Sequence, residues 1–285
     1  MGRFASALAF AFMLAVVLGS AGCGQRFDHP AGPPPTEAEL ASQALTALEE
    51  SGSAHVVVDA TGGSISGTTV PLSVHFEGDV SRSAVDGDGE VRFPGGTLGA
   101  RVLVGGHDVY IRFMGVWYRA ASGLDDAVAK ATESGGGLPA DLATPEGLGK
   151  RFGELFEGDV TQGPEVDGVA TWKFDGHLSG KTLVRYSEQY GGKELSDTDR
   201  ALLRKAAETS HFVLVVGRDD HLPRTIELSL DPPKDLQFDS EQVESGGPFS
   251  VKVELSNFGE DVSFTAPKDA KPLDALAEQL FGAMG

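Results

Sequence analysis

The residues of this chain that could do chemistry are few and scattered. Its seven histidines include no pair at the His-Glu-x-x-His spacing of a metal-binding helix, and none stands beside a serine or cysteine nucleophile motif. His55, His75 and His211 occupy the polar positions of alternating segments, so we expect them at the surface. A hydrolase would need an acid, a base and a nucleophile together, and the sequence displays no such set. We therefore predict no catalytic residue and no metal ligand, and a hydrolase is the weakest of the possible functions.

The acidic run Asp86-Gly87-Asp88-Gly89-Glu90 looks at first like the start of a calcium loop. An EF-hand spreads its ligands over about twelve residues and ends in a bidentate glutamate, which this run does not do. Asp-Gly pairs are also the usual residues of two-residue hairpin turns. We expect a tight hairpin here.

The only cysteine, Cys23, follows a leader-like segment. Arg3 is succeeded by an apolar stretch, Ala7 to Leu18, and then by the small residues Gly19 to Gly22. This order is typical of a secretory signal, and the apolar stretch is shorter than the roughly 20 residues of a spanning helix. A lone cysteine also excludes an intrachain disulfide and a thiolate metal cage.

The residues ending in Cys23 resemble the bacterial lipobox, although Ser20 stands where a leucine is usual. The resemblance implies cleavage before Cys23 and acylation of its thiol, so that residues 1–22 are a lipoprotein signal peptide. Each buried CH₂ contributes about 0.8 kcal/mol, so two or three acyl chains hold a protein on a membrane and one does not. The alternatives are an ordinary secreted protein with a stray cysteine and an uncleaved anchor helix.

The chain is strongly acidic, with 42 Asp and Glu against 23 Lys and Arg and a formal charge of −19. Nucleic-acid binding depends on Lys and Arg displacing counterions, so we expect no nucleic-acid partner. A body this acidic should stand off an anionic membrane. The segment Gln25 to Thr36 holds four prolines and suits that geometry as a semi-rigid tether.

The remaining sequence alternates between helical and extended patterns. Thr36 and Glu39 form a capping-box pattern at the start of a helix that ends near Ser51. Further helices are expected at Leu124–Ala131, Pro145–Glu157, Gly180–Gln189 and Asp197–Glu208. Between and around them lie short strands with period-two alternation and turn dipeptides, which favour an antiparallel meander over βαβ units.

These patterns predict one α+β domain over residues 38–285, preceded by a lipidated tether at residues 23–37. Its core would be a strongly curved antiparallel sheet, a half-barrel of about ten strands wrapped around a few helices. The tail from Lys271 to Met284 is amphipathic, and we expect it to be a helix that docks on the domain or acts as a lid.

One face of each strand is apolar and must be covered. A curved sheet encloses a cavity when its own side chains do not fill it, whereas the same residues form an ordinary packed core when they do. For any single residue, core packing is the simpler interpretation. The cavity candidates are Val74, Phe76, Val102, Val104, Ile111, Phe113, Phe152, Leu155, Phe156, Trp172, Phe174, Val216, Ile226, Leu228, Val251 and Val253.

Three segments carry a resemblance to a known family. They are the lipobox with its proline-rich tether and helix ending at Ser51–His55, the paired strand Val102–Arg112 with its Gly115–Tyr118 finish, and a terminal strand Val262–Pro267 running into a proline. In this order they resemble the lipid-carrier lipoproteins of mycobacteria and their relatives, the LppX/LprG type, which share the half-barrel fold of the LolA and LolB carriers.

The resemblance covers residues from about 20 to 270 and rests on loose motifs. It implies a cavity for the acyl chains of a lipid or glycolipid, a location on the extracytoplasmic face of the membrane with Cys23 as the anchor, and an envelope export protein as a partner. It implies neither a cofactor nor an enzyme activity. The alternative is a half-barrel lipoprotein without cargo, acting as a sensory or regulatory protein-binding module.

Overall fold

The computed structural model describes residues 33–62, 73–105, 108–120, 144–191, 194–231 and 248–275. The signal segment, Cys23, the tether up to residue 32, the expected helix Leu124–Ala131 and most of the C-terminal tail lie outside these residues. No helix among them is long and apolar enough to cross a membrane.

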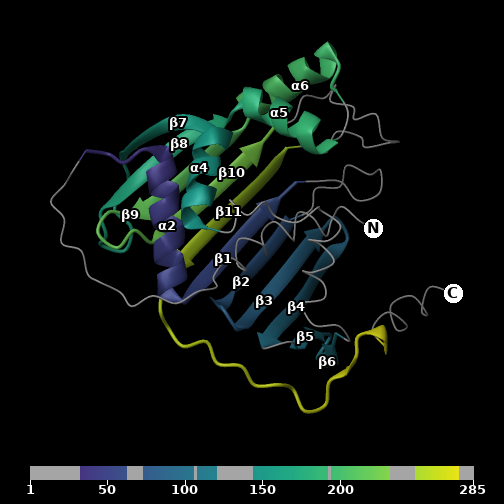
Figure 1. Ribbon diagram of the computed structural model, residues 1–285. Helices are drawn as coiled ribbons and strands as arrows, with labels where there is room; N and C mark the ends of the chain where they lie inside the picture. The colour runs from purple at the N-terminus through teal and green to yellow at the C-terminus, as the bar shows by residue number, and fades with distance from the viewer. Residues whose placement is uncertain are drawn as a thin grey trace.

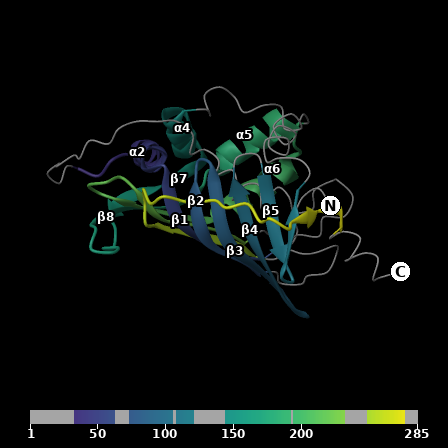
Figure 2. The same cartoon turned by 90° about the horizontal axis from the view of Figure 1, so that it is seen from below.

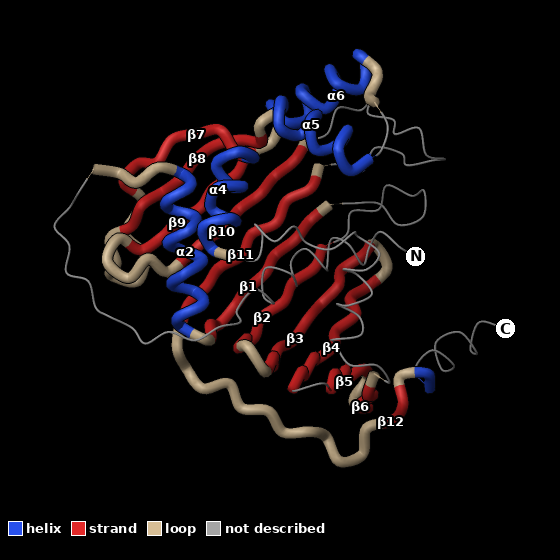
Figure 3. The backbone as a smooth tube through the Cα atoms, viewed as in Figure 1, coloured by secondary structure: helices blue, strands red, loops and turns tan. Residues whose placement is uncertain are grey.

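A single sheet of twelve strands forms the body of the described chain (Figures 1 and 3), and its first and last strands in the order, β12 and β7, are not paired to each other. The order is β12-β6-β5-β4-β3-β2-β1-β11-β10-β9-β8-β7. Neighbours are antiparallel except β12 and β6, which are parallel. The bounds are β1 Ser53–Thr61, β2 Ser73–Ser81, β3 Ala84–Phe93, β4 Gly96–Gly105, β5 Asp108–Phe113, β6 Val116–Arg119, β7 Phe156–Gln162, β8 Thr171–Leu178, β9 His211–Gly217, β10 Pro223–Leu230, β11 Phe249–Ser256 and β12 Lys271–Pro272.

Four helices accompany the sheet in the described residues: α2 Glu37–Ser51, α4 Pro145–Leu155, α5 Gly180–Gly191 and α6 Asp197–Glu208. The predicted α+β half-barrel class is confirmed, with twelve strands where about ten were expected. Local signals set the helix starts. Thr36 and Glu39 form the expected capping box at α2, and Ser196 and Asp199 form another at α6, which satisfies backbone N–H groups that have no partner inside the helix.

Helix α4 ends two residues earlier than the sequence predicts. Thr144 caps its start, and Pro145 occupies the first turn, where its missing N–H costs nothing. Phe156 is already extended and pairs with Leu178 as the first residue of β7. Helical spacing continues through Phe156 in the sequence, but pairing with β8 supplies the backbone bonds that a further helical turn would have made.

The register of the ladder gathers the apolar side chains on one face. Directly paired residues point to the same side of a sheet, so one row crosses β2, β1, β11, β10, β9 and β8. This row consists of Phe76, Val58, Val253, Ile226, Leu214 and Phe174. Helices α2 and α4 lie on this face (Figure 1) and pack against β7 and β10.

The expected hairpin at Asp86–Glu90 is wrong, because these residues form the middle of strand β3. Their acidic side chains alternate onto the polar face, and the two glycines between them face the apolar side. A Cβ at Gly87 would lie 2.5 Å from the ring of Phe76 on β2. The Asp-Gly repeat therefore makes room for a neighbouring ring instead of turning the chain.

The expected terminal strand at Val262–Pro267 is also not a strand. After β11 the chain continues as a strap that crosses the ends of β1 to β5 and reaches the edge strand β6 (Figure 2). The Gly259 N–H donates to the Ser53 carbonyl at 3.1 Å, and the Phe264 ring centroid lies 6.0 Å from that of Tyr110. A Cβ at Gly105 would lie 2.2 Å from the Phe264 ring. The Phe264 side chain thus holds residues 262–267 against β4 and β5, because these residues form no β-ladder pairs. The amphipathic tail begins with β12, and its remainder from residue 276 lies outside the described residues.

Candidate functional site

The first half of the apolar face, on β2 to β5, carries large side chains that are only partly buried. Val74, Phe76, Val102, Ile111 and Phe113 are all of intermediate exposure. Helices α2 and α4 lie over the other half of the sheet, α5 and α6 lie at the ends of its strands, and β2 to β5 are in view beside them in Figure 1. Leu48 near the end of α2 packs against the near end of this face, whereas Val74, Ile111 and Phe113 form an apolar surface that no described helix covers.

Small residues in the middle strands shape this surface. Gly78 on β2 pairs with Gly87 on β3, and Gly89 pairs with Ala100 on β4. All four lie on the apolar side by register. Glycine inside a strand marks a bend or a close approach. Here Gly87 admits the Phe76 ring, and Gly78 lies close to the backbone of β3, so the surface at these strands is flat. The sequence signal for these small residues is the Asp-Gly repeat, whose local pattern also fits a turn.

The second half of the apolar face is a filled core. The Phe174 side chain is fully buried, and its ring centroid lies 5.2 Å from that of Phe152 in an edge-to-face arrangement. Phe156 and Phe212 stack at 4.3 Å. Leu40 on α2 is fully buried against the same group. Side chains occupy this half, so its members act as core.

The predicted lining residues divide between these surroundings. Phe152, Phe156, Trp172, Phe174, Val216 and Leu228 belong to the filled core under α2 and α4. Phe76, Val102, Val104, Val251 and Val253 belong to a second cluster that includes Leu48 near the end of α2. Ile226 touches both clusters. Val74, Ile111 and Phe113 lie on the partly buried surface, and Leu155 is of intermediate exposure and belongs to neither cluster.

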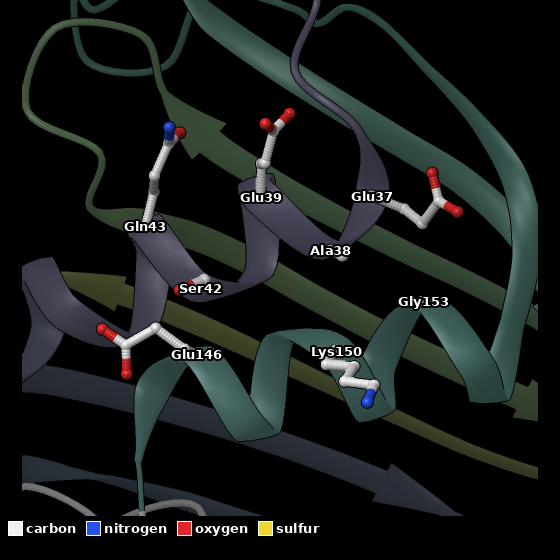
Figure 4. Close-up of a pocket in the computed structure, with 8 residues that line it drawn as sticks. All are labelled: Glu37, Ala38, Glu39, Ser42, Gln43, Glu146, Lys150 and Gly153. Carbon is white, nitrogen blue, oxygen red and sulfur yellow. The ribbon is translucent and has the colours of Figure 1, made fainter.

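A polar groove lies between helices α2 and α4 (Figure 4) and has a volume of about 520 Å³. It exists because Gly149 lets the two helices approach closely, since a Cβ there would lie 2.6 Å from the Ala38 carbonyl oxygen. Its lining contains none of the predicted cavity residues and consists of Glu37, Ala38, Glu39, Ser42, Gln43, Glu146, Lys150 and Gly153. The rim is charged, so the groove suits water and ions and does not suit acyl chains.

Hydrogen bonds give one groove residue a structural role. The Thr36 backbone N–H donates to Glu39 at 2.9 Å, and the Thr36 hydroxyl does the same. These bonds favour the carboxylate and lower the pKa of Glu39. Glu39 therefore caps the helix that covers the core.

The polar face of the sheet carries paired charges. His55 Nδ1 lies 2.7 Å from Asp79 Oδ1, and His75 Nδ1 lies 2.8 Å from Asp59 Oδ1. His211 lies on this face too, 2.9 Å from Asp175. The predicted surface position of these histidines agrees with the register. Within the described ranges no three His, Cys, Asp or Glu side chains are arranged to hold a metal ion.

On this polar face Asp175 has two charged partners. Lys173 Nζ donates to it at 2.5 Å and the His211 ring lies on its other oxygen. The Lys173 bond is the main reason that the pKa of Asp175 is lowered. All three groups are partly exposed and come from adjacent strands, which is the pattern of a cross-strand ion pair rather than a reactive site.

No family model matches the sequence. No curated protein matches it either. Among solved structures, the chain is similar to the Mycobacterium tuberculosis lipoprotein LppX at 16% identity and a TM-score of 0.45, over 81% of this chain and 100% of that one. It is similar to LprF from Mycobacterium bovis at 17% identity and a TM-score of 0.44, over 83% of this chain and 99% of the other. Both solved proteins come from mycobacteria.

Proposed function

We propose that this protein is a membrane-anchored extracytoplasmic lipoprotein that holds lipid or glycolipid acyl chains against the apolar face of its sheet. In this proposal residues 1–22 are removed, Cys23 is acylated, residues 23–37 are the tether and residues 38–285 form the carrying domain. The protein transports or presents its cargo across the envelope, with an envelope export protein as its partner, and it is not an enzyme.

The observation that carries the proposal is the difference between the two halves of the apolar face. Under α2 and α4 the aromatic rings fill the space, and Phe174 and Val216 are fully buried. On β2 to β5 one end of the face is also packed, with Val80, Val85 and Val104 buried. Toward the other end, Val74, Ile111 and Phe113 keep partial exposure. An open apolar face of this kind is covered by ligand, partner or further chain.

Acyl chains would gain enough on such a face to stay bound. Burial of a methylene contributes about 0.8 kcal/mol, so a dozen methylenes contribute about 10 kcal/mol before the entropic cost of binding. The face offers no positive charge by register. It is therefore suited to the apolar tails of a lipid, and the polar headgroup would lie at the edge of the face.

The test is to extract lipid from the full chain purified from membranes. Covalent acyl groups stay on Cys23 and appear in the protein mass, whereas cargo is released by solvent and identified by mass spectrometry. We expect about one lipid per chain. Val74→Trp fills the apolar face and should lose that lipid, and His75→Trp, the adjacent residue on the opposite face, should retain it.

Absence of releasable lipid from the wild-type chain would overturn the proposal. Recovery of one stoichiometric protein in place of lipid would favour the sensory or regulatory module. The anchor is tested separately by the mass of the mature protein, because Cys23→Ala should remain unprocessed and unacylated whether or not cargo binds.

A further inference from the structure

The hairpin of β3 and β4 extends beyond the body of the sheet. Strand β5 ends with Phe113 opposite Ala100, whereas β3 and β4 continue to pair up to Phe93 and Gly96. Residues Arg92 to Gly99 are all exposed even though they belong to the ladder or its turn. On its other side, β2 pairs with β3 as far as Arg92, which lies opposite Ser73. The hairpin therefore extends several residues past β5, and only its tip extends past the described part of β2 (Figure 2).

The projecting end carries the large exposed apolar side chains of the described chain. Phe93 is 36% exposed, Leu98 is 47% exposed and Met114 is 78% exposed. Phe93 and Leu98 share one face of the β3–β4 hairpin by register, and Met114 lies in the adjacent β5–β6 turn. Side chains of this size, gathered at two neighbouring tips, are unfavourable in water and mark an interaction surface.

The other face of the same tips carries arginines, most of which are paired with carboxylates: Arg101 lies 2.9 Å from Asp86, and Arg119 lies 2.6 Å from Asp108. The segments Arg92–Arg101 and Arg112–Arg119 contain four arginines and no acidic residue, in a chain of formal charge −19. Register places Arg101 opposite Arg112. Arg92 has an exposed pairing with Glu90 at 3.0 Å, and Arg112 makes no ion pair within the residues that the structure describes.

We propose that the β3–β4 and β5–β6 hairpin tips form a membrane-docking edge that inserts into an anionic phospholipid surface. Phe93, Leu98 and Met114 enter the boundary between headgroups and acyl chains, and Arg112 meets lipid phosphates. Trp117, on β6 beside Arg112, lies at the depth that tryptophan prefers at membrane interfaces. An amphipathic edge with basic and apolar sides binds such surfaces through both effects.

Docking by this edge goes beyond the proposed carrier function and does not require cargo or acylation. An anchor at residue 23 would hold the chain near the bilayer but would not orient it. The edge would orient it, because the apolar side of the tips continues through Val91 into the apolar face of the sheet. The bulk of the acidic body would remain in water while the apolar tips and Arg112 contact the lipid.

Tryptophan fluorescence of the full chain tests this edge directly. The chain has two tryptophans: Trp117 beside the tips and Trp172, which is 8% exposed at the other end of the sheet. The chain is mixed with vesicles of phosphatidylcholine and phosphatidylglycerol whose acyl chains are brominated, since bromine quenches only a tryptophan near the bilayer. We expect bromine-dependent quenching, and its loss in the double variant Leu98→Asp, Met114→Asp.

The control is Ser83→Asp, an exposed substitution in the β2–β3 turn at the opposite end of the strands, which should be quenched like the wild type. Arg112→Gln should raise the concentration of anionic lipid needed for half-maximal quenching by about fivefold, which is the effect of losing one surface charge. Circular dichroism melting of each variant establishes that it folds.

Three outcomes would overturn docking by this edge: equal fluorescence with brominated and ordinary lipid, quenching that persists in the Leu98, Met114 double variant, and equal quenching on vesicles of phosphatidylcholine alone. If the double variant instead converts a dimer to a monomer in sedimentation without lipid, the edge is a contact between copies. If the wild-type chain yields no extractable lipid but its fluorescence is still quenched by brominated vesicles, the carrier function is refuted and the docking edge is supported.

Discussion

Replacing Phe174 with alanine should be among the most damaging single changes in this protein. The side chain is fully buried on β8, and its ring lies 5.2 Å from that of Phe152 and 6.2 Å from that of Phe212. A buried Phe-to-Ala change costs about 3–5 kcal/mol, because it loses transfer free energy and leaves a cavity. With aromatic ring contacts of roughly 0.5–1.5 kcal/mol each included in that total, we expect about 4 kcal/mol.

The measurement is urea unfolding of the full chain, followed by circular dichroism, with Phe93→Ala as the matched control. Phe93 is the same residue type on the same face of the sheet, but it is 36% exposed at the hairpin tip. We expect it to lose less than about 1 kcal/mol on unfolding in water. Benzene should restore part of the stability of Phe174→Ala and none of that of Phe93→Ala, because an enclosed apolar cavity binds it.

A free energy loss below about 1 kcal/mol for Phe174→Ala, or a loss equal to that of Phe93→Ala, would refute the reasoning. The aromatic cluster would then not be packed, and the half of the sheet under α2 and α4 would have to be reconsidered as a place for cargo. A large loss that benzene does not relieve would mean that the surrounding rings collapse into the vacated space.

Three further predictions concern the sheet. Gly87→Val should destabilise by about 1–3 kcal/mol in thermal melts, since its side chain would enter a ring on β2; no loss would support a turn there. Gly105→Ala should destabilise similarly, and Phe264→Ala should relieve part of that loss in a double-mutant cycle; strict additivity would show that the strap does not lie on Gly105. Asp175 has a folded pKa below the unfolded value, mainly because of Lys173, so its stabilising contribution is present above pH 3.8 and disappears as the pH falls through the folded pKa. Asp175→Asn should reduce the slope of stability against pH in that acid range, and an unchanged slope would exclude the ion pair as its cause.

The described site was predictable only in part from sequence. Alternation along Val74–Phe76 and Val251–Val253 correctly placed their side chains on one face, because the side-chain period of a strand is a local property. Which half of that face is filled could not be inferred. It depends on α2 and α4 lying over β7 to β10, and so on contacts between segments far apart in the chain.

Local sequence patterns were enough to predict the helices that begin after Thr36 and at Asp197, the faces of the strands and the acidic surface, because each depends on neighbours a few residues away. Contacts between distant segments were needed to establish that Asp86–Glu90 is strand interior, that Phe264 rests on Gly105, and that the β3–β4 hairpin extends past β5. An Asp-Gly repeat is locally compatible with a turn and also with a strand. The choice between them is made by the partner strands on either side, whose pairing spans the chain and cannot be deduced from any short window.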